Sequence, residues 1–407
     1  MPLLKTNILN PLDPEQTEYL PHTYIKITGS RIEQIITHCP EPDYIDLSGY
    51  LCLPGFIDAH VHLSQLHSRG RFSASLMPWL RDHIFSEENK SQNLDFAHQI
   101  SIDFFHELIR NGTTTAVIYT APFFAACNIA FQTASEMGVR IIMGKTMMDN
   151  SNSYHLQENT DQSFQESVTL CERWHKATPL LEYAFSPRFA PVCSSRLLHM
   201  VGDFTTKNNI FIQTHISENL QEIKMVRELF PNFRNYAEVY EAHNLLHSRT
   251  LLAHAIHMEE AELKIIRNHN SKIIHCPDSN FFLKSGTFPL DKIKKAGIAF
   301  ALGTDVGAGT SLSMLNTMKM YNYRQPEQTV TPSEAFYRAT LAGAASLGKD
   351  DHLGSIIAGK EADLTFIEIP DLAQKSKEDL LSDLLFLGDK FRVKSVWIAG
   401  KSVYQAN

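Results

Sequence analysis

The stretch "PGFIDAHVHLSQ", residues 54–65, places two histidines one residue apart at the end of an apolar run. The segment "FIDAHVH" is typical of a buried β-strand, and residues i and i+2 of a strand point to the same side. His60 and His62 are therefore predicted to face one point. The chain has 19 histidines among 407 residues, so a single pair of this kind is expected by chance. The pair alone does not establish a metal site.

Composition narrows the class of protein. The chain is 43% hydrophobic, carries a net charge of −8 and has no long basic run, which argues against nucleic acid or an anionic membrane as a partner. No run approaches the roughly 18 apolar residues of a membrane span, and "MPLLKTNILNPLDPEQ" lacks a signal-peptide core. The six cysteines are scattered and form no C-x-x-C, so we expect buried free thiols and a cytoplasmic location.

The middle of the chain alternates between short apolar runs and helical patterns such as residues 95–111 and 219–230. The apolar runs are "TTTAVIY" (113–119), "RIIMGKT" (140–146), "LEYAFSP" (181–187), "NIFIQTHISE" (209–218), "TLLAHAI" (250–256), "SKIIHCP" (271–277) and "IAFALGTD" (298–305). This alternation predicts a parallel sheet, and roughly eight such units fit a (β/α)8 barrel. A doubly wound sheet would need a glycine-rich phosphate turn, and no G-x-G-x-x-G occurs.

Both ends of the chain are rich in β-branched runs broken by glycine, for example residues 23–38 and 393–405. We expect the two ends to pair into one small domain. The predicted architecture is α/β, with residues 1–54 and 354–407 forming a composite β domain beside a barrel of residues 55–353.

Polar residues also end the later predicted strands, where the catalytic groups of a barrel lie. They are His215 with Glu218 three residues later, His254, His275 and Asp305. Each alone has an ordinary structural explanation, such as a hydrogen-bonded buried histidine or a capping acid. Five strands that each end in such a residue favour a divalent metal site. Imidazoles with one carboxylate suit zinc, with iron as the competitor.

A catalytic metal keeps one position open and lowers the pKa of a bound water toward about 7. A carboxylate beside that water can take its proton and pass it to a substrate. Glu218 is the candidate for this role, against the alternative that it is only a favourable acid in the first turn of a helix.

Six segments carry a family resemblance that covers nearly the whole chain. They are "PGFIDAHVH" (54–62), "THISEN" (214–219), "AHAIHM" (253–258), "HCPDSN" (275–280), "LGTDVGAG" (302–309) and "GSIIAGKEADL" (354–364). In these segments the chain resembles the amidohydrolase superfamily. The resemblance implies a distorted (β/α)8 TIM barrel with a terminal β-sandwich. It also implies one Zn²⁺ per chain, or Fe²⁺, bound by His60, His62, His215 and Asp305. Glu218, His254 and Asp305 take the catalytic positions.

Within that superfamily the chain is similar to the guanine deaminases. Gln65 in "HLSQ", Arg188 and Phe189 in "SPRFAPVCS" (186–194), and Trp79 in "SASLMPWL" (73–80) carry this likeness. It implies hydrolysis of guanine to xanthine and ammonia by a homodimer. The implied substrate-binding residues are Gln65, Trp79, Arg188, Phe189, His215 and His254. The chemistry agrees, because an arginine fork matches the O6 and N7 acceptors of guanine and an aromatic ring stacks on a purine.

Several alternatives stay open at this point. The substrate of a related deaminase is another ring, such as a triazine, a pterin or a thioadenosine nucleoside. A ring-opening imidazolone hydrolase releases no ammonia, and a non-catalytic barrel would not need the complete set of polar residues. Lys145 lies where two-metal relatives carry a bridging modified lysine, but "GKTMMD" resembles the mononuclear deaminases, so we interpret Lys145 as structural.

Overall fold

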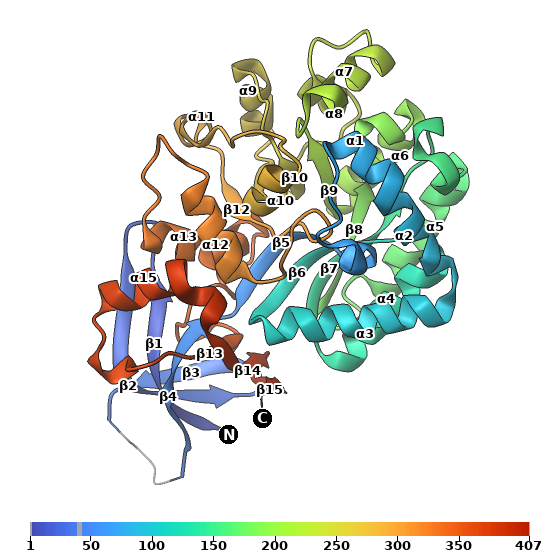
Figure 1. Ribbon diagram of the computed structural model, residues 1–407. Helices are drawn as coiled ribbons and strands as arrows, with labels where there is room; N and C mark the ends of the chain where they lie inside the picture. Colours follow the sequence, from blue (N-terminus) through green and yellow to red (C-terminus); the bar gives the residue numbers. More distant parts are fainter. Residues whose placement is uncertain (1, 39–42, 407) are drawn as a thin grey trace.

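The central sheet of the protein is a parallel barrel. The structure, a computed structural model, describes residues 2–38 and 43–406 (Figure 1). Eight parallel strands are adjacent in sequence order. They are β5 (Phe56–His62), β6 (Thr113–Thr120), β7 (Arg140–Met147), β8 (Leu181–Pro187), β9 (Phe211–Ile216), β10 (Thr250–His254), β11 (Lys272–His275) and β12 (Phe300–Leu302). Almost every residue in them is buried, as expected for strands covered on both faces. The predicted (β/α)8 architecture is confirmed.

The barrel closes where the segment after β12 meets β5. The Asp305 amide donates to the His60 carbonyl over 2.8 Å, and the His62 amide donates to the Val306 carbonyl over the same distance. Gly303 permits this approach, because a Cβ there would lie 2.8 Å from the Cβ of His60 and 2.9 Å from its backbone nitrogen. The first and last strands of the barrel thus bring "HVH" beside "GTD".

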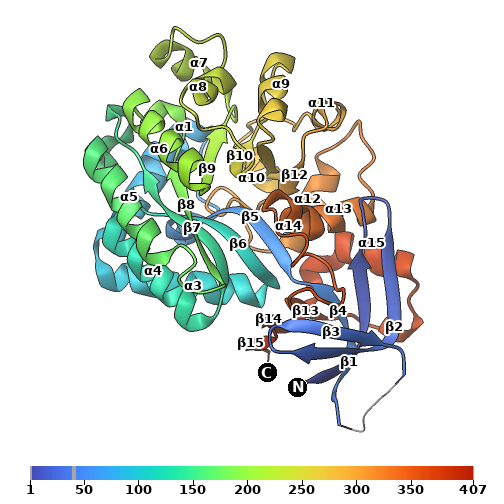
Figure 2. The same cartoon turned by 180° about the vertical axis from the view of Figure 1, so that it is seen from behind.

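Helices surround the barrel (Figures 1 and 2). They are α3 (Leu94–Arg110), α4 (Phe124–Met137), α5 (Thr160–Trp174), α6 (Ser195–Asn208), α7 (Leu220–Leu229), α8 (Tyr236–Ala242), α9 (Glu260–Asn268), α10 (Pro277–Phe282), α11 (Leu290–Ala296), α12 (Met314–Tyr323), α13 (Pro332–Ala339) and α14 (Leu341–Ser346). Helix α3 is representative, since Asn93 caps it and Phe104, Phe105 and Leu108 are buried on its inner face. The helices predicted at 95–111 and 219–230 are confirmed as α3 and α7.

A helical cap lies in the long connection between β5 and α3. It consists of α1 (Leu76–Trp79), a π-helical turn η2 (Leu80–Ile84) and α2 (Phe85–Asn89). Trp79 and Leu80 are buried, and both line the cavity at the C-terminal mouth of the barrel. Short 3₁₀ turns occur at η1 (Leu63–Ser68), η3 (Lys90–Gln92), η4 (Ser151–Leu156), η5 (Ala190–Val192), η6 (Leu372–Gln374) and η7 (Gly388–Lys390).

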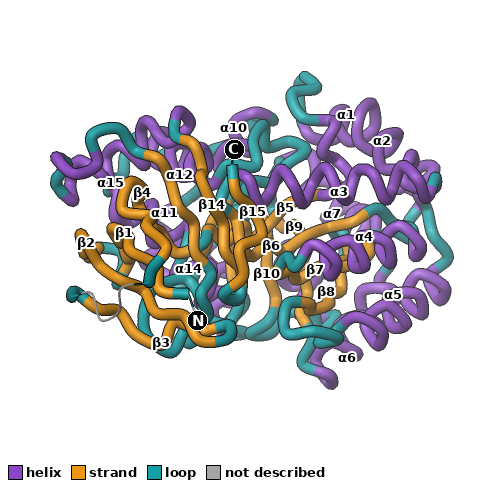
Figure 3. Tube along the Cα trace, turned by 90° about the horizontal axis from the view of Figure 1, so that it is seen from below, coloured by secondary structure: helices purple, strands orange, loops and turns teal. Residues whose placement is uncertain are grey.

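The two ends of the chain form a second sheet beside the barrel (Figure 3). Its strands are β1 (Leu3–Pro11), β2 (Thr17–Thr28), β3 (Arg31–Ile36), β4 (Ile45–Pro54), β13 (Leu364–Glu368), β14 (Arg392–Ile398) and β15 (Lys401–Gln405), in the order β15-β14-β13-β4-β1-β2-β3. Antiparallel pairing of β4 with β13, with Leu53 opposite Thr365, joins the two ends. Helix α15 (Lys377–Leu387) packs against α12 and α13. A separate terminal β structure is thus confirmed, and the boundaries at 54 and 354 stay a prediction.

The cysteines that the structure describes agree with the expectation of free thiols. Cys52, Cys127, Cys171, Cys193 and Cys276 are unpaired and buried. Cys39 lies outside the described residues. Among the described helices, none combines the length and the apolar character that crossing a membrane requires.

Candidate metal centre and substrate pocket

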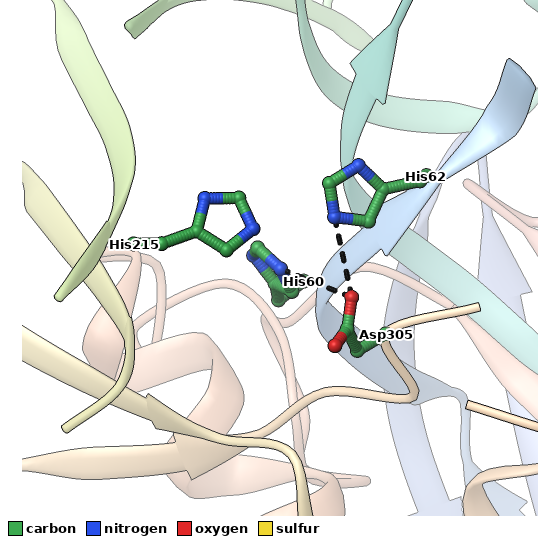
Figure 4. A group of neighbouring side chains, drawn as sticks. All are labelled: His60, His62, His215 and Asp305. Atoms are coloured by element: carbon green, nitrogen blue, oxygen red, sulfur yellow. Dashed lines mark ion pairs between the residues drawn. The ribbon is translucent and has the colours of Figure 1, made fainter. Parts of the chain in front are cut away.

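Four side chains from three parts of the barrel converge at its C-terminal end (Figure 4). His60 and His62 extend from β5, His215 from β9, and Asp305 lies three residues after the end of β12. One nitrogen or oxygen of each lies within 4.8 Å of those of the other three. Asp305 Oδ1 is 3.4 Å from His60 Nε2 and 3.2 Å from His62 Nε2. The structure therefore brings together all four residues that the sequence proposed as metal ligands.

The protonation states of this cluster suit a divalent cation. Burial lowers the pKa of His62 and lowers that of His215 well below its ordinary value, so both imidazoles are neutral and able to ligate. Burial would raise the pKa of Asp305, but the His60 and His62 imidazoles beside it hold that pKa well below its usual range. Asp305 is thus a carboxylate beside the neutral imidazoles of His62 and His215.

Hydrogen bonding orients the ligand atoms toward one point. His215 Nδ1 lies 2.6 Å from the Arg188 carbonyl oxygen, so Nδ1 carries the proton and Nε2 is left as the free donor atom. His60 Nε2 is buried and makes no hydrogen bond within the described residues, although Asp305 Oδ1 lies 3.4 Å away. A buried nitrogen without a partner costs free energy unless something binds it. A metal coordinated by these atoms satisfies that requirement.

The backbone around this centre is strained. His254, Asp305 and Ser217 adopt positive φ angles of 74°, 48° and 49°, a region that costs a residue other than glycine about 1–3 kcal/mol. All three lie at or just beyond the ends of barrel strands. The strain redirects the chain at the point where the side chains must face the barrel axis.

A second group of possible ligands shares Asp305 and adds His254 and Cys276. Burial raises the pKa of the Cys276 thiol well above its ordinary value, and the charge of Asp305 raises it further. The thiolate, rather than the thiol, is the form that binds metals. The three histidines with Asp305 are therefore the better metal site.

Glu218 occupies the side of the cluster nearest to His254. His254 Nε2 is 3.6 Å from Glu218 Oε2 and 3.8 Å from Asp305 Oδ2. Burial raises the pKa of Glu218 well above its usual value, and the charges of Asp305 and Glu222 raise it further. A buried carboxyl with a raised pKa is suited to take up and release a proton near neutral pH.

His254 has a defined proton arrangement. Its Nδ1 lies 2.8 Å from Asn280 Nδ2, an amino group that only donates. Burial lowers the pKa of His254 to about 3. The neutral ring therefore carries its proton on Nε2, which faces Glu218 and Asp305, and presents a hydrogen-bond donor to that space.

A cavity opens directly above the cluster and contains every residue that the sequence proposed for substrate binding. It is lined by His62, Gln65, Leu76, Trp79, Leu80, Arg188, Phe189, His215, Glu218, Glu222, His254, Leu283, Asp305 and Ala308. Trp79 Nε1 donates to the Arg71 carbonyl over 3.0 Å, so the indole is held with its ring facing the cavity wall. Apolar groups and a few polar side chains share the lining, as in small-molecule sites.

Two other residues that the sequence singled out lie apart from the cluster. The His275 ring stacks on Phe288 with 4.1 Å between centroids, and His275 belongs to neither ligand group. Lys145 Nζ pairs with Glu158 and lies 3.6 Å from Glu166 Oε2 on α5, which agrees with a structural role.

Five buried residues of the site were not assigned from the sequence. Ser285 Oγ donates to Glu218 Oε1 over 2.8 Å, and Glu222 Oε2 accepts the Glu218 amide over 2.9 Å. Asp58 accepts the Thr304 amide over 2.9 Å and so joins β5 to the chain after β12. The remaining two are Asn280, beside His254, and Glu88, which contacts Gln65 and Arg188. Asp58 lies in "PGFIDAHVH" and Asn280 in "HCPDSN", whereas Glu88, Glu222 and Ser285 lie outside the motifs that indicate the site.

Comparison with known proteins places this geometry in a family. The model of the amidohydrolase family matches residues 51–403. The chain belongs to the amidohydrolase family. This family is generally metal-dependent, which agrees with the four-residue cluster. The barrel, the terminal sheet and the position of the polar residues at the strand ends are thus those of a family member.

Within this family, the chain is similar to several proteins named guanine deaminase. Guanine deaminase of Escherichia coli (strain K12) is 37% identical over 380 residues, which cover 90% of this chain and 86% of the relative. Guanine deaminase of Homo sapiens is 30% identical over 377 residues, covering 86% and 82%. The crystal structure of guanine deaminase from C. acetobutylicum with bound guanine matches with a TM-score of 0.94 at 28% identity, over 99% of this chain and all of that chain.

The metal assignment predicts the behaviour of ligand variants. His60→Ala and Asp305→Ala should each lose the bound metal, because a catalytic site has only three or four protein ligands. Metal content per chain, measured by elemental analysis after gel filtration, tests this. His275→Ala is the matched control, since it removes a buried histidine from the end of β11, the strand next to β12, and His275 belongs to neither ligand group. Full metal content in His60→Ala and Asp305→Ala would remove the ligand assignment.

Proposed function

We propose that this protein is a zinc-dependent guanine deaminase that hydrolyses guanine to xanthine and ammonia. The observation that carries the proposal is the convergence of Arg188, Phe189 and Gln65 with Glu218 at the mouth of the His/Asp cluster. Relatives named guanine deaminase at 30–37% identity over most of the chain support the same substrate. We also propose a homodimer in the cytoplasm, on the family resemblance and the free buried thiols.

The proposed metal ligands are His60, His62, His215 and Asp305. A divalent cation held there would act as a Lewis acid and would lower the pKa of a water molecule toward about 7, which would make hydroxide available at neutral pH. Three imidazoles and one carboxylate favour zinc, with Fe²⁺ as the competitor. The positions of these side chains are fixed by the barrel, so the protein orients the site before substrate binds.

Glu218 and His254 are proposed to manage the protons. Water adds to C2, the carbon that bears the exocyclic amine of guanine, and Glu218 takes a proton from the water and delivers it to N3. Glu218 then takes the second proton from the oxygen that has added to C2 and passes it to the amine. As the C2–N bond breaks, the C2 oxygen becomes the carbonyl of xanthine and ammonia leaves. His254 donates its Nε2 hydrogen to the oxygen that attacks, because its Nδ1 is already occupied by Asn280.

Arg188, Gln65, Phe189 and Trp79 are proposed to hold the base. A guanidinium fork suits the acceptor edge of guanine, and Phe189, which is 3% exposed, provides an aromatic surface beside His215. Because the acceptor and donor groups of this pocket are buried, a ring that leaves them unpaired binds weakly. The competing substrates are triazines, pterins and thioadenosine nucleosides, and no observation favours one of them over guanine.

A panel of substrates tests the proposal. Ammonia release should be measured for guanine, adenine, cytosine, a pterin and thioadenosine, with absorbance spectra of the products. We expect guanine to have the highest kcat/KM and its product to have the spectrum of xanthine. A higher kcat/KM for a pterin or a nucleoside would reassign the substrate. An imidazolone completes the panel, and loss of its ring absorbance without ammonia release would indicate ring opening instead.

Replacement of Glu218 tests the proton transfer. Glu218→Gln should keep its metal and lower kcat by about 10²–10⁴-fold, because the amide has a similar size but cannot carry a proton. Glu262→Gln is the matched control, because Glu262 is another buried glutamate near the start of a helix, but its carboxylate accepts backbone amides and does not line the cavity. Turnover of Glu218→Gln near that of Glu262→Gln would show that Glu218 is only a helix-start acid.

A further inference from the structure

The cap helix α2 places a buried carboxylate between the two polar side chains proposed to bind the base. Glu88 is 1% exposed. Its Oε1 accepts a hydrogen bond from Gln65 Nε2 over 2.8 Å, and its Oε2 accepts one from Arg188 Nη1 over 2.7 Å. Gln65 follows β5 and Arg188 follows β8, so Glu88 joins two strand ends that lie far apart in the sequence.

The same helix contacts Arg188 a second time. The guanidinium carbon lies 5.4 Å from the ring centroid of Phe85, three residues before Glu88 and on the same face of the helix. An ion pair with the carboxylate and a cation–π contact with the ring therefore fix the position of the guanidinium. The Arg188–Glu88 pair is also buried on both sides, with side chains 4% and 1% exposed.

The charge of Glu88 sets the orientation of the Gln65 amide. A carboxylate only accepts hydrogen bonds, so the amino end of Gln65 must face it. The amide oxygen is then the end of Gln65 that remains to accept a hydrogen bond from a bound ring. Arg188 commits Nη1 to Glu88 and keeps other N–H groups as donors. The pocket thus presents one acceptor beside a set of donors.

We infer that Glu88 is the positioning residue that makes this pocket specific for a ring lactam, an N–H adjacent to a carbonyl. Guanine presents this pattern at N1 and C6. A ring nitrogen beside an exocyclic amine presents the reverse pattern, which leaves the Gln65 oxygen facing a lone pair and the Arg188 donors facing an amine. Unpaired buried groups of this kind cause strong discrimination between otherwise similar substrates. The inference rests on the proposed function and adds the origin of its specificity.

The test compares guanine with 2,6-diaminopurine, which keeps the amine at C2 and reverses the pattern at N1 and C6. In Glu88→Gln the new amide can either donate or accept, so Gln65 is free to turn and Arg188 loses its anion. We expect KM for guanine to rise at least about 10-fold and the preference for guanine over 2,6-diaminopurine to fall by about 10-fold or more. The preference is measured as the ratio of kcat/KM values, or of KM to the inhibition constant where 2,6-diaminopurine is not turned over.

Glu87→Gln is the matched control. Glu87 is the neighbouring residue of α2 and pairs with Lys90 over 2.7 Å rather than with the pocket. It should keep both the activity and the preference of the wild type. If Glu88→Gln lowers kcat/KM for guanine and for 2,6-diaminopurine by the same factor, the preference is unchanged. In that case Glu88 is a structural residue and the inference is wrong.

A second variant covers the case in which Glu88→Gln does not fold. Glu88→Asp keeps an acceptor-only group but withdraws it by one methylene, so KM for guanine should rise while the preference for guanine persists. A KM within two-fold of the Glu87→Asp value would overturn the inference. If the wild-type enzyme releases no ammonia from guanine, both the proposed function and the inference are wrong. If the wild-type enzyme is active but Glu88→Gln has the same preference for guanine, only the inference is wrong.

Discussion

The hydrogen bonds that close the barrel between β5 and the chain after β12 are the constraint on which the site depends. They pair Asp305 with His60 and His62 with Val306, so the register of the closure decides which side chain stands beside the histidines. A shift by one residue would turn the carboxylate to the other face of the strand. Asp58 strengthens the same junction by accepting the Thr304 amide. The hydrogen bonds that close the barrel therefore also set the positions of the proposed metal ligands.

The pKa values of two carboxyl groups above this junction are shifted in opposite directions, and this difference indicates their roles. The adjacent His60 and His62 imidazoles hold the pKa of Asp305 low, whereas burial and neighbouring carboxylates raise that of Glu218. Two carboxyl groups with such different pKa values allow one site to contain both a permanent anion and a proton carrier. Ser285 and Glu222 fix Glu218 from the outside, and Asn280 fixes His254. Asp305 is suited to remain an anion beside a cation, and Glu218 is suited to transfer protons.

The sequence predicted the barrel because strand and helix periodicities alternate clearly. It predicted the cluster because every proposed ligand lies at the end of a strand or shortly after it. The structure adds what periodicity does not encode. Glu88 looks like a helix acid in "SEEN", and only tertiary contact reveals that its carboxylate faces Gln65 and Arg188. His275 ends a strand as His254 does, yet its ring turns to Phe288. Strand-end position alone does not determine which side chains reach the axis.

Reconstitution with metal tests the central claim, that the strand ends hold one cation on which guanine deamination depends. The purified enzyme would be stripped with a chelator and titrated with Zn²⁺, with ammonia release from guanine measured at each addition. Activity should be absent without metal, rise linearly and level off at one equivalent per chain, because the four proposed ligand atoms lie within 4.8 Å of one another. Undiminished activity in the stripped enzyme, or a plateau at two equivalents, would contradict the account.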